Sequence, residues 1–247
     1  MTKAGKSRII EQNKRKSGDK MRKQEIAKNV QRIKCEIENG NPYGENILLC
    51  AATKMQSVED INFAIQAGVD AVAENKPQEF RDKNEGLLPC PRHFIGHLQT
   101  NKIKYLIGKI ELYHSCDRED LAQELARVSL AKGIVSNVLI QINIGEEASK
   151  GGYNYQNAKE IFTRLSQTAG LRVKGFMAML PERGTQDYKR GLVRKMRNLF
   201  DWAKAQSGDV EYLSMGMSGD YALCVSEGAN IIRLGSTLFG KRDYGQQ

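Results

Sequence analysis

The sequence has no apolar stretch long enough to cross a bilayer, and its N-terminus lacks the apolar core found in secretory signal peptides. We therefore expect a cytoplasmic protein without membrane association. The five cysteines are scattered, and no two of them form a Cys-x-x-Cys pair. This pattern favours reduced thiols over a disulfide framework or a zinc site.

Histidine is scarce as well. His93, His97 and His114 are too few and too dispersed to indicate a metal site. We interpret His97 as a residue of the site rim and the other two as structural. The glycine-containing segment 145–152 does not match the spacing of a nucleotide-binding P-loop. We expect neither a bound metal nor a nucleotide site of that type.

The net charge of +9 is concentrated at one end of the chain. Residues 1–23 carry nine basic and two acidic side chains, so the remainder is close to neutral. This segment has few apolar residues to bury and no aromatic residue among its charges. We interpret residues 1–22 as a solvated, partly disordered extension, and its composition argues against nucleic acid as a partner.

The body of the chain has a regular alternation. From residue 23 onward, apolar runs alternate with amphipathic segments, which is typical of a parallel sheet built from βαβ units. Eight strands in one domain indicate an α/β fold of the (β/α)₈ TIM-barrel type, with an open doubly wound sheet as the alternative. The predicted strands lie at 47–53, 70–74, 92–96, 111–116, 137–144, 172–179, 211–217 and 229–235, and predicted helices at 57–67, 98–107, 118–132, 156–168 and 187–205.

A further helix is predicted over residues 23–38. Ile26, Val30, Ile33 and Ile37 recur there at helical spacing before the stop signal Gly40. Only about a dozen residues follow the eighth predicted strand, which is too few for a full covering helix. We therefore expect the N-terminal helix to complete the outer ring, with residues 23–247 forming one barrel domain.

Active sites of such barrels lie at the carboxyl ends of the strands, and polar residues follow most of the predicted strands. Lys54 closes the apolar run 47–54. Burying an ammonium lowers a lysine pKa, and a neutral amine is suited to forming an imine with an aldehyde. The alternative is a lysine just past the strand that points into water. The full set of polar strand-end residues is Lys54, Glu74, Asn75, His97, Ser115, Asp117, Asn143, Ser218, Arg233 and Ser236.

The last two strand ends are rich in glycine and hydroxyl groups. Residues 214–220 read Ser-Met-Gly-Met-Ser-Gly-Asp, and residues 232–237 read Ile-Arg-Leu-Gly-Ser-Thr. Glycines let the backbone approach a phosphate, and N–H groups and serine hydroxyls donate to its oxygens. A helix predicted to begin near Ser218 would add the positive end of its dipole. The alternative is a tight turn with Ser218 as an ordinary N-cap.

An imine-forming lysine and a phosphate cradle in one barrel indicate two ligand classes. One is pyridoxal 5'-phosphate (PLP), and the other is a sugar phosphate held as in a Schiff-base aldolase. Arg233 bears on the choice, because an arginine that faces the pyridine nitrogen keeps that nitrogen unprotonated. The same side chain could also bind the phosphate or form a structural ion pair.

Longer segments carry a family resemblance. The block 93–102 reads His-Phe-Ile-Gly-His-Leu-Gln-Thr-Asn-Lys, and it is supported by segments 138–143, 149–150, 175–179, 213–218, 233–236 and 239–242. These segments resemble the pyridoxal phosphate homeostasis proteins (the YggS/PROSC family), which are themselves similar to the N-terminal barrel of alanine racemase. The resemblance covers all but the basic extension.

This resemblance implies that the cofactor is PLP, held as a Schiff base on Lys54. It further implies that Ser218, Gly235 and Ser236 bind the phosphate, with the backbone of Met217 nearby. No residue with a dedicated catalytic role is implied.

The same resemblance places Asn75 near the cofactor ring and Arg233 near the ring nitrogen or the phosphate. Two positions depart from the family pattern. Thr53 occurs where serine is usual, and residues 73–76 read Ala-Glu-Asn-Lys in place of Gly-Glu-Asn-Tyr. These changes affect the packing around Asn75 and leave the lysine and the phosphate segments intact.

The implied function is the holding and transfer of PLP and the balance of amino and keto acids. Racemisation needs acid–base groups on both faces of a carbanion, and in alanine-racemase-like enzymes the second group comes from another domain, which we expect this chain to lack. We expect a monomer that hands PLP to apoenzymes. The alternatives are a PLP-dependent racemase or decarboxylase of small amino acids, a Schiff-base aldolase, and a nucleic-acid binder acting through residues 1–23.

Overall fold

The structure is a computed structural model that describes residues 3–240, with the side chains of residues 20–240. Eight parallel strands close into a barrel in chain order, and β1 pairs with β8 to complete the ring. This closure confirms the predicted (β/α)₈ barrel and excludes the open sheet. The strands are β1 (Leu48–Ala52), β2 (Ala71–Glu74), β3 (Arg92–Phe94), β4 (Leu112–Cys116), β5 (Ser136–Ile142), β6 (Leu171–Ala178), β7 (Tyr212–Ser214) and β8 (Ile231–Leu234).

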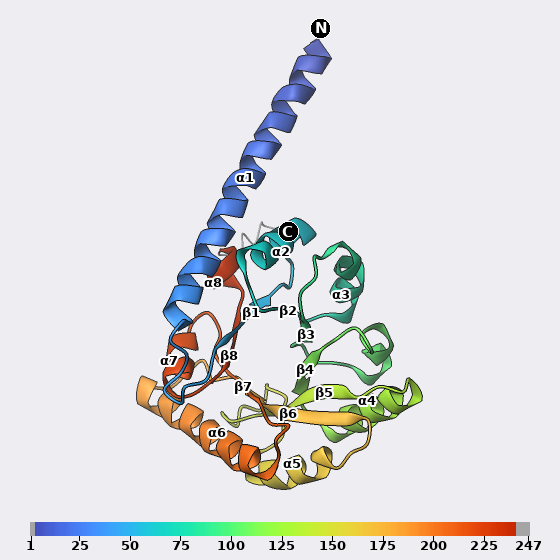
Figure 1. Cartoon of the computed structure of the whole chain (residues 1–247), viewed down its shortest axis with the longest axis vertical. Helices are drawn as coiled ribbons and strands as arrows, with labels where there is room; N and C mark the ends of the chain where they lie inside the picture. Colours follow the sequence, from blue (N-terminus) through green and yellow to red (C-terminus); the bar gives the residue numbers. More distant parts are fainter. Residues whose placement is uncertain (1–2, 241–247) are drawn as a thin grey trace.

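Helices surround the barrel, as Figure 1 shows. They are α1 (Lys3–Ile37), α2 (Val58–Ala67), α3 (Pro77–Lys83), α4 (Glu119–Ala131), α5 (Ala158–Ser166), α6 (Gln186–Gln206), α7 (Tyr221–Ser226) and α8 (Ser236–Phe239), with the 3₁₀ helices η1 (Asn84–Gly86), η2 (Thr100–Tyr105) and η3 (Tyr155–Asn157). Within the described part of the chain, none of these helices has both the length and the apolar composition that a membrane crossing requires.

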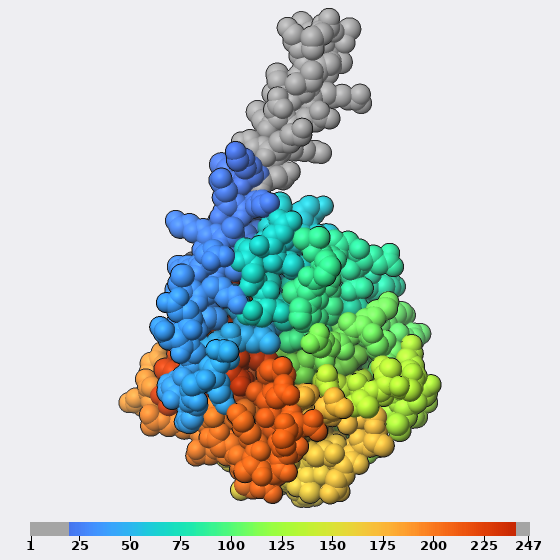
Figure 2. All heavy atoms as spheres, in the orientation of Figure 1, coloured from blue at the N-terminus to red at the C-terminus, as the bar shows by residue number. Residues whose placement is uncertain are grey.

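Helix α1 completes the outer ring, as predicted, but it begins at Lys3 instead of residue 23, so the helix extends through most of the predicted basic extension. The four periodic residues Ile26, Val30, Ile33 and Ile37 are buried and pack in one apolar cluster with residues of α2 and α8. Helix α8 has only four residues, so α1 covers the part of the barrel next to β1 and β8 (Figures 1 and 2). The side chains of residues 1–19 lie outside the described part, so the division into residues 1–22 and residues 23–247 stays a prediction.

Two layers of side chains cover the strands. The outer layer is apolar and packs against the helices. The inner layer is built from small and medium apolar residues, among them Cys50, Ala71, Ala73 and Leu139. Polar side chains also enter the barrel interior, and they include the predicted site residue Arg233.

The structure corrects one predicted helix and adds another. Residues 98–107 contain the 3₁₀ helix η2, in which i→i+3 bonds such as Leu106 N–H to Ile103 O bring Ile103, Leu106 and Ile107 to the core. Helix α3 was not among the predicted helices. The proline at its first position is a standard start signal that the sequence offered.

Candidate functional site

The predicted site residues gather at the carboxyl ends of four strands. Strands β2, β1, β8 and β7 are consecutive neighbours in the barrel, so residues at their ends share one side of the rim. A Cβ atom on Gly235 would lie 3.5 Å from the carbonyl oxygen of Ala52, which shows how closely the loop after β8 approaches the end of β1. The set comprises Lys54, Asn75, Met217, Ser218, Arg233, Gly235 and Ser236.

Lys54 lies two residues beyond β1, and its side chain is half-buried. This position falls between the two predicted alternatives, a buried lysine at a strand end and a lysine in open water. Two other lysines of this rim, Lys76 and Lys83, pair with carboxylates. Among the described side chains Lys54 forms no such pair, so its amine is available to a ligand.

Asn75 contributes an acceptor to the same rim. Its side-chain Oδ1 is buried and has no hydrogen-bond partner among the described residues. Its backbone is fixed by close packing, because a Cβ atom on Gly96 would lie 1.9 Å from the Asn75 carbonyl oxygen, and only glycine fits there. A buried acceptor without a partner is a group that a bound ligand would satisfy.

The loops after β7 and β8 meet at Ser218. Its hydroxyl oxygen accepts a hydrogen bond from the backbone N–H of Thr237 at 3.3 Å. Gly216 has a φ of 102°, and a Cβ there would lie 2.9 Å from Cα of Tyr221, so the sharp turn requires glycine. Gly235 is half-buried and Ser236 is exposed. The two loops therefore present hydroxyl and N–H groups together, as a phosphate site requires.

The helix that follows this turn differs from the prediction. Helix α7 begins at Tyr221, and Ser218 is not its N-cap. Instead, the amides of Asp220 and Tyr221 both donate to the Met217 carbonyl, which makes residues 217–220 a separate turn. The Met217 amide donates to Asp220 Oδ1 at 2.6 Å, so this backbone group already has an anionic partner. Neither a dipole contribution at Ser218 nor the N-cap alternative is supported.

Arg233 is buried inside the barrel and bonds only to neutral groups. Its Nη1 donates to the carbonyl of Ser214 at 2.8 Å and to Ser214 Oγ at 2.5 Å, and its Nη2 donates to the carbonyl of Ala178 at 3.2 Å. Burial lowers the pKa of Arg233, because desolvation penalises the guanidinium. Arg233 forms no ion pair with any described residue, so its predicted role as part of a structural ion pair is excluded there.

A chain of hydrogen bonds continues from Arg233 along the barrel interior. Ser214 Oγ, which accepts from Arg233, also forms a hydrogen bond with Nδ1 of His114 at 2.9 Å. Nε2 of His114 is in turn hydrogen-bonded to Nδ1 of His93 at 3.0 Å. Burial lowers the pKa of His93 to about 4 and that of His114 well below its usual value, so both rings are neutral at pH 7. Both histidines are buried in the barrel interior and hydrogen-bonded, and their interpretation as structural residues stays a prediction.

The other polar residues of the rim largely satisfy one another. His97 is exposed at the rim, and its Nδ1 lies 2.8 Å from Asp117 Oδ2. Ser115 Oγ donates to the Gly96 carbonyl, and Asn143 Nδ2 donates to the Lys150 carbonyl at 3.0 Å. These residues fix the loops on the opposite side of the rim.

Sequence reasoning missed several contacts of the predicted set, although Ser214 and Thr237 lie within the two predicted phosphate segments. Ser214 holds the Arg233 guanidinium, and Thr237 bonds to Ser218. Lys83 contacts the residue before Lys54, and only its i+4 spacing from Glu79 was visible in the sequence. The first two contacts join different strands, so no local pattern could reveal them.

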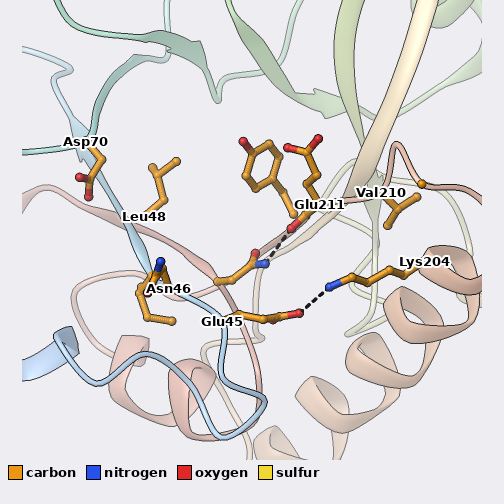
Figure 3. A pocket seen from close by; sticks show the side chains of 11 residues that line it. Glu45, Asn46, Leu48, Asp70, Lys204, Val210 and Glu211 are labelled. Atoms are coloured by element: carbon orange, nitrogen blue, oxygen red, sulfur yellow. Dashed lines mark hydrogen bonds and ion pairs between the residues drawn. The ribbon is translucent and has the colours of Figure 1, made fainter.

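The residues present fit an aromatic aldehyde that carries a phosphate. An unpaired amine, a pair of hydroxyl-bearing loops, a guanidinium with neutral partners and an unpartnered amide oxygen lie at the same end of one barrel. A separate cavity lies at the opposite end of the barrel. This cavity of about 540 Å³ opens at the amino end, where Figure 3 shows Glu45, Asp70, Lys204 and Glu211 around it.

The structure is a (β/α)₈ barrel whose carboxyl end carries an unpaired lysine and two hydroxyl-bearing loops, and barrels of this class are known from other proteins. The sequence model of the alanine racemase N-terminal domain family matches residues 22–243. The chain belongs to that family and, within it, to the pyridoxal phosphate homeostasis proteins.

Individual relatives support this assignment. A pyridoxal phosphate homeostasis protein of Aquifex aeolicus is 40% identical over 81% of this chain and 90% of its own length. A crystal structure of an unknown protein from Bifidobacterium adolescentis is 31% identical, with a TM-score of 0.84 over 89% of this chain and 96% of that one. PipY of Synechococcus elongatus, solved with PLP bound, is 28% identical, with a TM-score of 0.76 over 87% of this chain and 100% of that one.

Proposed function

We propose that this chain is a PLP-binding protein that holds PLP as a Schiff base on Lys54 and serves intracellular PLP homeostasis. The observation that carries the proposal is the half-buried amine of Lys54, which has no carboxylate partner at a rim that also carries two hydroxyl-bearing loops. PLP supplies an aldehyde that condenses with a lysine amine and releases water. The likeness to relatives of that name and to PipY with PLP bound supports the same reading.

Each predicted residue has a role in this proposal. Ser218, Gly235 and Ser236 bind the phosphate through hydroxyl and N–H groups. Met217 contributes backbone, provided that its amide exchanges Asp220 for the ligand. These groups hold the ligand so that its aldehyde lies beside the lysine.

The remaining two residues address the ring. In this proposal Arg233 faces the ring nitrogen rather than the phosphate. The bonds of its guanidinium to Ser214 and Ala178, away from the loop residues that surround Ser218, support this orientation. Asn75 offers its unpartnered Oδ1 to a donor of the ligand.

The biological role follows from the same assignment. We propose holding and transfer of PLP to apoenzymes in the cytoplasm, without a dedicated catalytic activity, by a monomer for which nucleic acid is not a partner. The near-neutral body of the chain and its five free cysteines support a reduced compartment and a small-molecule ligand.

The test is covalent trapping of PLP on the full-length protein. Wild type, Lys54→Ala and the control Lys76→Ala are mixed with PLP, reduced with borohydride and mapped by mass spectrometry. We expect a pyridoxyl adduct on residue 54 and an imine absorbance band in wild type and Lys76→Ala, and neither in Lys54→Ala. Absence of that adduct from wild type would overturn the proposed function.

A second measurement separates carriage from turnover. The PLP-loaded protein is incubated with D- and L-amino acids, and the products are followed by chiral chromatography. We expect no sustained conversion. Conversion that depends on Lys54 would make the chain a racemase and would contradict the carrier role.

A further inference from the structure

A compact ionic cluster lies behind Lys54. The ammonium of Lys83, the last residue of α3, donates three hydrogen bonds. Its acceptors are the Thr53 carbonyl at 3.0 Å, Glu74 Oε1 at 2.8 Å and Glu79 Oε2 at 2.8 Å. All three donor positions of the ammonium are therefore used.

The cluster holds both residues that flank Lys54. On one side, Lys83 bonds directly to the Thr53 carbonyl. On the other side, Glu79 Oε2 accepts from the backbone N–H of Met55 at 2.8 Å. One ammonium thus fixes the peptide groups before and after Lys54, directly in the first case and through Glu79 in the second.

The backbone between these two anchors has an unusual conformation. Met55 has a φ of 61°, in the left-handed region that non-glycine residues seldom adopt. Its side chain is exposed, so burial of that side chain does not account for the conformation. Met55 is the third residue of a turn that the Gln56 N–H closes by donating to the Thr53 carbonyl at 3.1 Å, a position where a positive φ occurs. The bond from the Met55 amide to Glu79 holds this turn from the outside, because a strained residue persists where its surroundings fix it.

The same cluster reaches the neighbouring strand. Thr53 Oγ1 donates to Glu74 Oε1 at 2.8 Å, and the Asn75 amide donates to Glu74 Oε2 at 3.3 Å. Glu74 is buried, so its charge needs the ammonium of Lys83. The ends of β1 and β2 are therefore locked together where Lys54 and Asn75 leave them.

We propose that Lys83 is a positioning residue for Lys54, acting through Thr53, Glu74 and Glu79 to aim the Lys54 amine at its ligand. The inference rests on the proposed function of Lys54 as the point of PLP attachment. A purely structural ion pair would stabilise the fold without affecting the attachment of a ligand once the protein is folded.

The chain offers a matched control for that distinction. Lys174 on β6 is 14% exposed, like Lys83, and its ammonium bonds to Glu211 at 2.6 Å. Glu211 precedes β7, so this pair lies at the amino end of the barrel, away from Lys54. Lys83→Met removes a largely buried ammonium from Glu74 and Glu79, and Lys174→Met removes an equally buried ammonium from Glu211.

The experiment measures the rate of covalent PLP attachment to Lys54 against PLP concentration, by borohydride trapping and mass mapping of full-length protein. In Lys83→Met we expect the maximal rate constant to fall on the order of 10- to 100-fold, while the PLP concentration at half-maximal rate stays near wild type. The phosphate loops, which set that concentration, are untouched. Lys174→Met is expected to match wild type in both quantities, and equal rates in the two variants would overturn the inference.

Two further measurements keep the inference testable. If Lys83→Met does not fold, Glu79→Ala removes the acceptor of the Met55 amide together with the Glu79 bonds to Lys83 and Lys76. Its maximal rate constant is expected to fall even though Lys83 still bonds to Glu74 and to the Thr53 carbonyl. Hydrogen exchange of the Met55 amide in the PLP-free protein is expected to quicken about tenfold in both variants. Unchanged exchange would reject the role of Lys83 even if wild type bound no PLP, and an absent wild-type adduct alone would reject the proposed function.

Discussion

The two ends of the barrel are both rich in charged side chains, and they differ in how those charges are neutralised. At the amino end, Glu45 accepts from Arg197 at 2.7 Å and from Lys204 at 3.0 Å. Arg197 also lies over the ring of Tyr43, 3.6 Å from its centroid. At the carboxyl end, the guanidinium of Arg233 has only neutral partners.

This difference is the one that the proposed function requires between an end that stabilises the fold and an end that binds PLP. Charges at the amino end neutralise one another within the protein, so a ligand has little charge left to compensate. At the carboxyl end the unpaired Arg233 and Lys54 and the unpartnered Asn75 Oδ1 leave interactions for a ligand to complete. The cavity of about 540 Å³ at the amino end (Figure 3) therefore indicates open volume rather than the binding chemistry.

The largest expected effect on stability comes from removing the ion pair between Arg197 and Glu45 at the amino end of the barrel. Arg197→Met leaves the partly buried Glu45 without its main partner, and we expect the free energy of unfolding to fall by about 3–5 kcal/mol. Urea unfolding of the PLP-free protein measures this loss. PLP attachment in the protein that remains folded is expected to be unchanged.

An exposed ion pair serves as the control for Arg197. Arg164 pairs with Glu119 at 2.6 Å, and both side chains are more than 40% exposed, so Arg164→Met should cost less than about 1 kcal/mol. A folded Arg197→Met variant that no longer attached PLP would show that the two ends are not functionally separate.

The second prediction concerns the histidines that lie between the two ends. Burial lowers the pKa of His93 from 6.5 to about 4 in the folded protein. Between these two pH values the unfolded chain binds a proton at His93 and the folded chain does not. The contribution of neutral His93 to the free energy of unfolding is therefore fully present above pH 6.5. About 3 kcal/mol of the free energy of unfolding is lost as the pH falls from 6.5 to about 4. His114 adds a loss of the same sign.

Unfolding of wild type and His93→Gln across pH 4–7.5 checks this prediction. The difference in free energy of unfolding between the two proteins should be constant above pH 6.5 and should change in favour of the variant below it. A constant difference over the whole range would mean that His93 is not buried in its neutral form.

The smallest effect is expected at Met55. Glycine adopts a φ of 61° without strain, so Met55→Gly should raise the free energy of unfolding by up to about 1 kcal/mol. The matched control is Glu146→Gly, because Glu146 has a φ of 53° in the loop that follows β5, away from Lys54. PLP attachment should slow in the first variant, where the backbone next to Lys54 gains freedom, and not in the second. Equal rates of PLP attachment in Met55→Gly and Glu146→Gly would show that the backbone conformation of Met55 does not position Lys54.

Much of the fold was predictable from the sequence, and for local reasons. Each strand is a short apolar run between turn signals, and the periodic residues Ile26 and Ile33 revealed the face of α1 that packs on the barrel. Residues 98–107 were predicted as one helix because periodicity does not distinguish an α-helix from a 3₁₀ helix that buries the same residues. Helix α3 was missed because seven residues give too short a pattern.

The candidate site likewise contains features that local sequence predicts and contacts that it does not. Lys54, Ser218 and Gly235 could be predicted as site residues because strand ends and glycine-rich turns are local features. The contact of Ser214 with Arg233 could not be predicted, since it joins β7 to β8 across the barrel interior. The predicted start of a helix near Ser218 was wrong because Asp220 captures the Met217 amide and forms a separate turn.

The sequence by itself determined the alternation of strands and helices, the lysine that follows the first strand and the glycine-rich ends of the last two strands. Each of these depends on residues close together in the chain. The tertiary structure alone decided that Lys83 bonds to Thr53, 30 residues away, and that Arg233 meets neutral partners instead of a carboxylate. Such contacts form only when the barrel closes and brings the ends of distant strands within hydrogen-bonding distance.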